Sequence, residues 1–183
     1  MSRNIALLGM MGAGKTTVAA LVADALGRTA VDTDAEIERW VGDPIPVIFA
    51  TRGEAVFRDL ERQVVEELAK LDDLVLALGG GTVLRDDNVA SLALTGVLVE
   101  LRARPEVLIE RLRSGSDGRP LLTGDLDTQL RKTYDERADR YAEVADLTVD
   151  AERPPAEVAR AIIDWTLTAG DVLTPSEHEQ VMR

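Results

Sequence analysis

The stretch "GMMGAGKTT" at residues 9–17 limits the possible folds of this chain more than any other segment. It follows the apolar run "NIALL" and precedes a helical pattern that begins at Lys15. A turn with three glycines costs backbone entropy and buries no side chain, so something must approach its backbone closely. Gly9, Gly14, Lys15 and Thr16 fit the spacing GxxxxGK followed by Ser or Thr, and they stand between a strand and a helix as that motif requires.

In this setting backbone N–H groups and the helix N-terminus converge on a phosphate. The lysine reaches the terminal phosphates, and the hydroxyl of Thr16 can ligate magnesium. We therefore predict a nucleotide-binding loop; the alternative is a flexible turn with a surface lysine. The expected nucleotide contacts here are Gly12, Ala13, Gly14, Lys15, Thr16 and Thr17.

Short apolar runs alternate with amphipathic stretches along the chain. We expect strands at 4–9, 29–32, 74–80, 97–102 and 147–150, and helices at 15–26, 34–41, 53–71, 105–113, 126–144 and 154–168. Unbroken apolar strands separated by helices predict an α/β fold, a parallel sheet covered on both faces. In such sheets the ligand site lies beyond the carboxyl ends of the strands.

Length and composition limit the classes of function. A chain of 183 residues suffices for one domain, which we expect at 1–169, with a poorly ordered tail at 170–183. A net charge of −12 argues against nucleic acid and anionic membranes as partners. The absence of cysteine excludes disulfides and fits a reducing compartment, and the apolar runs are too short for a signal peptide or a membrane span. We expect a cytoplasmic monomer.

The second strand ends in "DTD", which contains Asp32 and Asp34. Two carboxylates near phosphate oxygens suggest that one faces a metal and the other a hydroxyl group to be phosphorylated. The alternative is local: Thr33 and Glu36 make a capping-box pattern, and Asp34 suits the N-terminal turn of a helix. The stretch alone leaves both interpretations open.

Two further stretches suggest a pocket for an anion. Arg58 and Glu61 in "FRDLE" are three residues apart, so a salt bridge could hold the guanidinium for capture of a carboxylate; a solvated ion pair is the alternative. The glycines of "LGGGT", residues 79–81, would let a ligand lie against the backbone, although a plain loop fits equally well.

Two more arginines carry a weaker signal. Arg119 falls in "GRPLL", within a candidate mobile loop at 114–125. Arg137 lies on a helix rich in charged residues. Taken alone, each is an ordinary surface residue.

Together, "GMMGAGKTT", "DTD", "GEAVFRDLE", "LGGGT", "GRPLL" and "RADRYAEVAD" resemble the shikimate kinase family in order and spacing, over roughly residues 3–165. The resemblance implies ATP-dependent phosphorylation of the shikimate 3-hydroxyl, a step on the route to aromatic amino acids. It also implies a five-stranded parallel sheet of the P-loop, nucleoside-monophosphate-kinase type. A substrate-binding region would lie at about 33–61 and a lid at about 113–125.

The resemblance assigns roles on the phosphate side residue by residue. Lys15 and Thr16 would serve the phosphates and Mg²⁺, and Asp32 would lie near the metal through water. Asp34 would receive the acceptor hydroxyl, and Arg119 would be the lid cation on the phosphates. ATP and Mg²⁺ are thus the implied co-substrate and cofactor.

On the acceptor side, the resemblance implies that Arg58 and Arg137 hold the shikimate carboxylate and that Glu61 orients Arg58. The residues expected along the ring are Gly79, Gly80 and Gly81, and those expected as an apolar wall are Ile45, Phe49 and Phe57. Adenine would rest between Arg113 and Pro155. The chain departs from the family in having Asp139 and Arg140 before Tyr141, which makes Arg140 a rival to Arg137. His178 receives no role.

The sequence leaves three alternative functions open. A gluconate kinase also joins a P-loop to an anion pocket, although "FRDLE" with "GGGT" fits shikimate better. The second alternative is a nucleoside-monophosphate kinase. The third is a regulatory nucleotide-binding module with a degenerate acceptor site.

Overall fold

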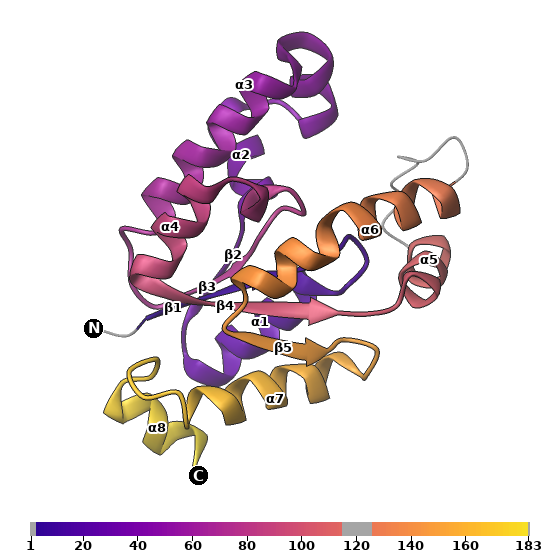
Figure 1. Ribbon diagram of the computed structural model, residues 1–183. Coiled ribbons are helices and arrows are strands. Elements are labelled where there is room, and N and C mark those ends of the chain that lie inside the picture. Colours follow the sequence, from indigo (N-terminus) through magenta and orange to yellow (C-terminus); the bar gives the residue numbers. More distant parts are fainter. Residues whose placement is uncertain (1–2, 115–125, 183) are drawn as a thin grey trace.

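The computed structural model describes residues 3–114 and 126–182 and centres on one parallel β-sheet (Figure 1). The sheet has five strands in the order β2-β3-β1-β4-β5. The strands are β1 (Asn4–Leu8), β2 (Thr29–Asp32), β3 (Leu74–Ala77), β4 (Gly96–Arg102) and β5 (Leu147–Asp150). The predicted α/β fold is confirmed, as is the five-stranded parallel sheet.

Helices cover both faces of the sheet. They are α1 (Lys15–Leu26), α2 (Thr33–Val41), α3 (Ile45–Leu68), α4 (Asp86–Thr95), α5 (Pro105–Ser114), α6 (Leu126–Val144), α7 (Pro155–Thr166) and α8 (Pro175–Val181), with a 3₁₀ turn at Thr82–Leu84. In Figure 1, α6 crosses in front of the sheet, α1 and α7 lie on the other side, and α2 and α3 extend away from one end.

The apolar runs fold as buried strands because both of their faces are covered. Every residue of β1 and β3 is buried, whereas the edge strands β2 and β5 are partly exposed. Since all strands are parallel, their carboxyl ends meet along one edge of the sheet. "DTD" and "GGG" follow neighbouring strands, β2 and β3, and "GMMGAGKTT" follows β1 next to them.

The structure differs from the predicted helices in three places. Helix α3 begins at Ile45 rather than at Gly53, and Gly53 lies at a kink with φ 83° and ψ 167°, a conformation that glycine adopts most readily. The short helix α4 was not predicted from its sequence. The same is true of α8, which lies in the segment for which we expected poor order.

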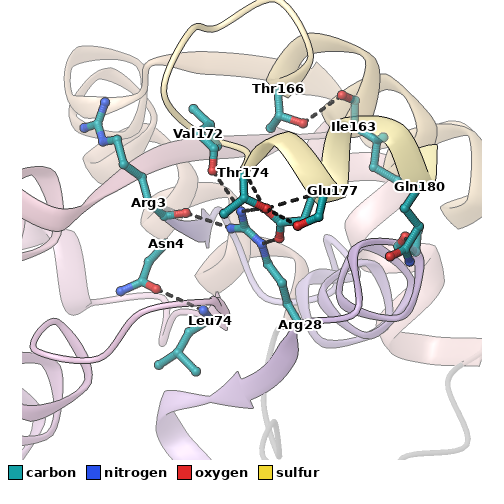
Figure 2. A network of polar contacts seen from close by, with 12 residues as sticks. Arg3, Asn4, Arg28, Leu74, Ile163, Thr166, Val172, Thr174, Glu177 and Gln180 are labelled. Carbon is teal, nitrogen blue, oxygen red and sulfur yellow. Dashed lines mark hydrogen bonds and ion pairs between the residues drawn. The ribbon is translucent and has the colours of Figure 1, made fainter. Parts of the chain in front are cut away.

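The tail folds because it supplies the partner of a buried arginine (Figure 2). Arg28 Nε donates to Glu177 Oε1 at 2.6 Å, and the Arg28 side chain is only 1% exposed. Its other nitrogens donate to the carbonyls of Arg3 and Val172, at 2.7 and 2.8 Å. Thr174 and Glu177 form a capping box at the start of α8. The structure thus places a helix, α8, in the segment for which the sequence showed little periodicity, and polar contacts hold it in place.

None of the helices within the described ranges combines the length and the apolar composition that a bilayer crossing needs.

Candidate active site

The loop between β1 and α1 surrounds the Lys15 ammonium group with backbone. Lys15 Nζ donates to the carbonyls of Gly9 and Met10, at 2.8 and 3.0 Å. Burial lowers the pKa of Lys15 to about 8, and the negative charges of Asp34 and Asp32 partly offset this effect. The lysine therefore lies within electrostatic reach of both aspartates of "DTD".

The glycines of this loop have different neighbours. Gly9 has φ 138°, and a Cβ there would lie 2.6 Å from the carbonyl oxygen of Leu101 on β4, so strand packing requires this glycine. Gly14 has φ 89° and directly precedes α1, and a Cβ there would meet no atom within 4 Å. Of these two, only Gly14 faces open space where a phosphate could approach. The sequence interpretation, in which a ligand explains both, is therefore corrected for Gly9.

Asp32 joins this loop to α2. Thr16 Oγ1 donates to Asp32 Oδ2 at 2.7 Å, so the two residues predicted to serve the metal lie side by side. Asp32 Oδ1 accepts from the backbone N–H groups of Asp34 and Ala35, at 3.0 and 3.3 Å, which makes Asp32 the N-cap of α2. The alternative interpretation holds in part: Asp34 lies in the first turn of α2, but the N-cap is Asp32 rather than Thr33, so Thr33 and Glu36 do not form a capping box.

Thr33 and Glu36 are used elsewhere. The hydroxyl of buried Thr33 accepts from the N–H of Gly79 at 2.9 Å, which ties α2 to the turn after β3. Glu36 instead accepts from Arg39 Nε at 2.8 Å. The contact from Thr33 brings "DTD" against the glycines of "GGG".

Each of the three consecutive glycines has a different side chain against it. A Cβ on Gly79 would lie 2.5 Å from Asp34 Oδ1, and a Cβ on Gly81 would lie 2.8 Å from Arg58 Cζ. A Cβ on Gly80 would lie 3.5 Å from Arg137 Nη1, which is an ordinary contact. Gly79 and Gly81 are thus glycines because functional groups occupy the space of their side chains. One short turn gathers a carboxylate and two guanidinium groups from α2, α3 and α6.

Arg58 is held by a buried carboxylate. Its Nη1 donates to Glu61 Oε2 at 2.9 Å, and Thr82 Oγ1 donates to Glu61 Oε1 at 2.8 Å. Glu61 is 1% exposed, so the alternative of a solvated ion pair is wrong. The Arg58 guanidinium also lies 5.2 Å from the centre of the Phe57 ring and 3.4 Å from Glu54. Sequence reasoning did not identify Thr82, because its contact joins segments 21 residues apart.

Arg137 and Arg140, the two candidates on α6, make different hydrogen bonds. Arg137 Nη1 donates to the carbonyl oxygen of Gly80 at 3.0 Å. Arg140 instead donates to the carbonyl oxygen of Val83 at 3.0 Å and forms ion pairs with Asp86 and Glu143. Arg137 therefore lies at the glycine turn, whereas Arg140 fastens α6 to α4.

Residues 11–167 match the family model described as shikimate kinase. The chain belongs to the shikimate kinase family. Among curated relatives, shikimate kinases from Thiobacillus denitrificans and Burkholderia lata are 48% and 47% identical to it, each over 82% of this chain and 82% of the relative. A solved structure of shikimate kinase from Acinetobacter baumannii in complex with shikimate has a TM-score of 0.85 and 37% identity, and covers 93% of this chain and 96% of that one.

Other P-loop kinases share the fold at lower similarity. A gluconokinase from Sinorhizobium meliloti has a TM-score of 0.61 and 21% identity, and covers 91% of this chain and 96% of that one. At that identity the likeness shows the fold alone. Membership of the shikimate kinase family thus rests on the sequence match and on the much closer structural neighbours.

The three residues expected to form an apolar wall lie on α3, the helix that also carries Arg58. The rings of Phe49 and Phe57 are 4.6 Å apart, and Phe57 is 5% exposed. Ile45, at the start of the same helix, packs partly buried against the core. The three residues are thus brought to one helix, on both sides of the kink at Gly53.

The predicted adenine contacts are less closely grouped. Pro155 begins α7, but Arg113 is paired with Asp127 at 2.6 Å and its side chain is 63% exposed. Arg111, which sequence reasoning passed over, donates to the carbonyl oxygen of Glu152 at 3.4 Å, in the turn that leads to Pro155. Arg119 and most of the expected lid lie outside the described residues, so their assignments stay predictions.

Proposed function

We propose that the glycine turn at residues 79–81 is the acceptor site of a shikimate kinase reaction, in which the chain transfers the γ-phosphoryl group of ATP to the 3-hydroxyl of shikimate. The chain is a small-molecule kinase of the shikimate kinase family, and enzymes of this family use ATP with Mg²⁺. One observation carries the proposal: Asp34, Arg58 and Arg137 converge on three consecutive backbone positions. These groups match a hydroxy acid, because guanidinium groups bind carboxylates and a carboxylate can receive a hydroxyl proton.

The two arginines differ in how their charge is balanced. Glu61 and Glu54 already lie against Arg58. No carboxylate forms a salt bridge with Arg137 in residues 3–114 and 126–182, and its Nη1 donates to the neutral carbonyl of Gly80. An incoming carboxylate would therefore meet two different guanidinium groups. That of Arg58 is fixed in direction, and that of Arg137 carries uncompensated charge.

The nucleotide side uses the loop after β1. Gly14 leaves open space at the N-terminus of α1, where backbone N–H groups and the helix dipole favour phosphate. A phosphate would draw the Lys15 ammonium away from the carbonyls of Gly9 and Met10. The oxygens of Thr16 and Asp32, hydrogen-bonded at 2.7 Å, are hard ligands that suit Mg²⁺. When bound, Mg²⁺ neutralises charge on the phosphates.

In the proposed step, the shikimate hydroxyl oxygen forms a bond to the γ-phosphorus while the bond from that phosphorus to the bridging oxygen of ADP breaks. Asp34 receives the hydroxyl proton, and Lys15 stabilises the negative charge that develops on the phosphates. The protein supplies mainly orientation and charge, because phosphoryl transfer needs little covalent chemistry from it.

The cellular setting is also part of the proposal. A net charge of −12 disfavours self-association, and the absence of cysteine fits a reducing compartment. We propose that the chain works as a cytoplasmic monomer. Size-exclusion chromatography with light scattering should return the mass of one chain, 19.8 kDa, whereas twice that mass would refute the monomer.

A coupled assay of ADP release tests the reaction. Shikimate with ATP and Mg²⁺ should give turnover that disappears when Mg²⁺ is withheld. Gluconate, AMP, CMP and UMP should each give no turnover above the background hydrolysis of ATP. Turnover with gluconate or a nucleotide, and none with shikimate, would overturn the proposed substrate.

A further inference from the structure

We propose that Tyr141 is a positioning residue of the acceptor site, which sets the affinity for the substrate carboxylate through Arg137 without touching the substrate. The inference rests on the proposed function, because it takes Arg137 as a ligand of that carboxylate.

Tyr141 and Arg137 share one hydrogen-bond acceptor. Tyr141 lies one turn after Arg137 on α6, and its hydroxyl donates to the carbonyl oxygen of Gly80 at 2.6 Å. Arg137 Nη1 donates to the same oxygen at 3.0 Å. A carbonyl oxygen has two lone pairs, and these two donors occupy both. The shared oxygen therefore fixes the middle of the glycine turn and the guanidinium with respect to each other.

The environment of the hydroxyl gives it a fixed direction. Tyr141 is 2% exposed, and a buried tyrosine hydroxyl needs a hydrogen-bond partner. Burial raises the pKa of Tyr141, Arg137 lowers it in part, and Glu100 on β4 raises it further. The group thus stays a neutral hydroxyl in the neutral pH range and can donate to Gly80.

The two arginines of the acceptor site are held in different ways. Buried Glu61 fixes Arg58, and Thr82 in turn fixes Glu61. Arg137 has no such carboxylate within the described residues, which leaves its charge available for a ligand. The Tyr141 hydroxyl is neutral and fixes the Gly80 oxygen to which Arg137 donates. Unlike a counter-ion, it leaves the charge of Arg137 uncompensated. Tyr141 therefore positions Arg137 through a neutral group, whereas Glu61 positions Arg58 through a charged one.

The first test is Tyr141→Phe, which removes the hydroxyl and keeps the buried ring. A neutral hydrogen bond of ordinary net strength corresponds to an increase of about threefold to tenfold in the KM for shikimate. The kcat and the KM for ATP should change by less than about twofold, since neither depends on the direction of Arg137. Tyr134→Phe is the matched control, because Tyr134 lies seven residues earlier on the same helix and makes no contact with Gly80 within the described residues. An unchanged KM for shikimate in Tyr141→Phe would overturn the proposal.

A double-mutant cycle with Arg137→Ala separates positioning from a structural role. If Tyr141 acts through Arg137, Tyr141→Phe should leave the KM for shikimate unchanged in the Arg137→Ala background. An equal increase in both backgrounds would refute positioning. If Arg137→Ala alone leaves this KM unchanged, the acceptor role of Arg137 in the proposed function fails, and the inference fails with it. An effect of Arg137→Ala without one of Tyr141→Phe refutes the inference alone.

A measurement that keeps the Tyr141 hydroxyl in place covers the case in which Tyr141→Phe does not fold. The chain has two tyrosines, so Tyr134→Phe labelled with 3-fluorotyrosine gives a single fluorine signal in NMR, from Tyr141. Saturating shikimate should shift that signal, because a carboxylate on Arg137 changes the field at the neighbouring ring. A signal that does not move would contradict the inference.

Discussion

Replacing Glu177 by glutamine removes the counter-ion of a buried arginine while nearly preserving the size of the side chain. Glu177 accepts from Arg28 Nε at 2.6 Å and from Arg28 Nη2 at 3.1 Å. Glutamine can still accept a hydrogen bond there, but it is neutral, so Arg28 would face uncharged oxygen atoms, among them the carbonyls of Arg3 and Val172.

The magnitude follows from the burial of the pair. The Arg28 and Glu177 side chains are 1% and 11% exposed. Breaking a buried pair by removing one partner costs about 3–5 kcal/mol, and the remaining hydrogen bond reduces this to about 2–3 kcal/mol. For a domain of this size, that loss lowers the melting temperature by about 4–12 °C.

Thermal unfolding followed by circular dichroism measures this loss. Asp164→Asn is the control, because its pair with Arg160 is solvent-exposed, and its melting temperature should stay within about 2 °C of the unaltered chain. Equal melting temperatures for Glu177→Gln and Asp164→Asn would refute the reasoning.

The same pair predicts a pH dependence. Burial raises the pKa of Glu177, but hydrogen bonds from Arg28 and Thr174 outweigh it and hold the pKa below its ordinary value of 4.5. A carboxyl group whose pKa is depressed by folding stabilises the fold above its unfolded pKa, and this stabilisation is lost as the pH falls through the folded value. The difference in melting temperature between Glu177→Gln and the unaltered chain should therefore shrink below about pH 4.5.

Three substitutions at the acceptor site have separate expected results. Gly81→Ala places a methyl group 2.8 Å from Arg58 Cζ and should raise the KM for shikimate by about tenfold or more. Gly80→Ala is the control and should raise this KM much less, because a methyl group there makes only an ordinary contact with Arg137. Equal effects of the two substitutions would contradict the packing argument. Asp34→Asn should lower kcat by at least about a hundredfold in the ADP assay, and near-normal turnover would remove Asp34 from the mechanism. Thr82→Val leaves one oxygen of buried Glu61 without its donor and should cost about 1–3 kcal/mol of unfolding free energy in denaturant titrations, with recovery in Thr82→Ser.

Local patterns allowed much of the fold to be predicted. The apolar run of β1 and the glycine-lysine loop after it predicted the strand, the turn and the start of α1, because each depends on neighbours in sequence. The pairing of Arg58 with Glu61 was predictable for the same reason, since one helical step joins them. Burial of Glu61 was not predictable, because it depends on packing.

Contacts between distant segments were beyond sequence reasoning. Arg137 entered only through the family resemblance, since its partner Gly80 lies 57 residues away, and the hydroxyls of Thr82 and Tyr141 gave no local signal. Helix α8 has seven residues and is anchored through Arg28, at a separation of 149 residues. Gly53 was read as a helix start, whereas its positive φ marks a kink within α3.

The steady-state kinetics of Arg58→Ala test most directly the claim that one glycine turn builds the acceptor site apart from the nucleotide site. Arg58 lies against Gly81, while the phosphate loop surrounds Lys15. The account predicts a large increase in the KM for shikimate, on the order of tenfold to a hundredfold, with the KM for ATP nearly unchanged. Equal increases in both constants, or no change in the constant for shikimate, would contradict it.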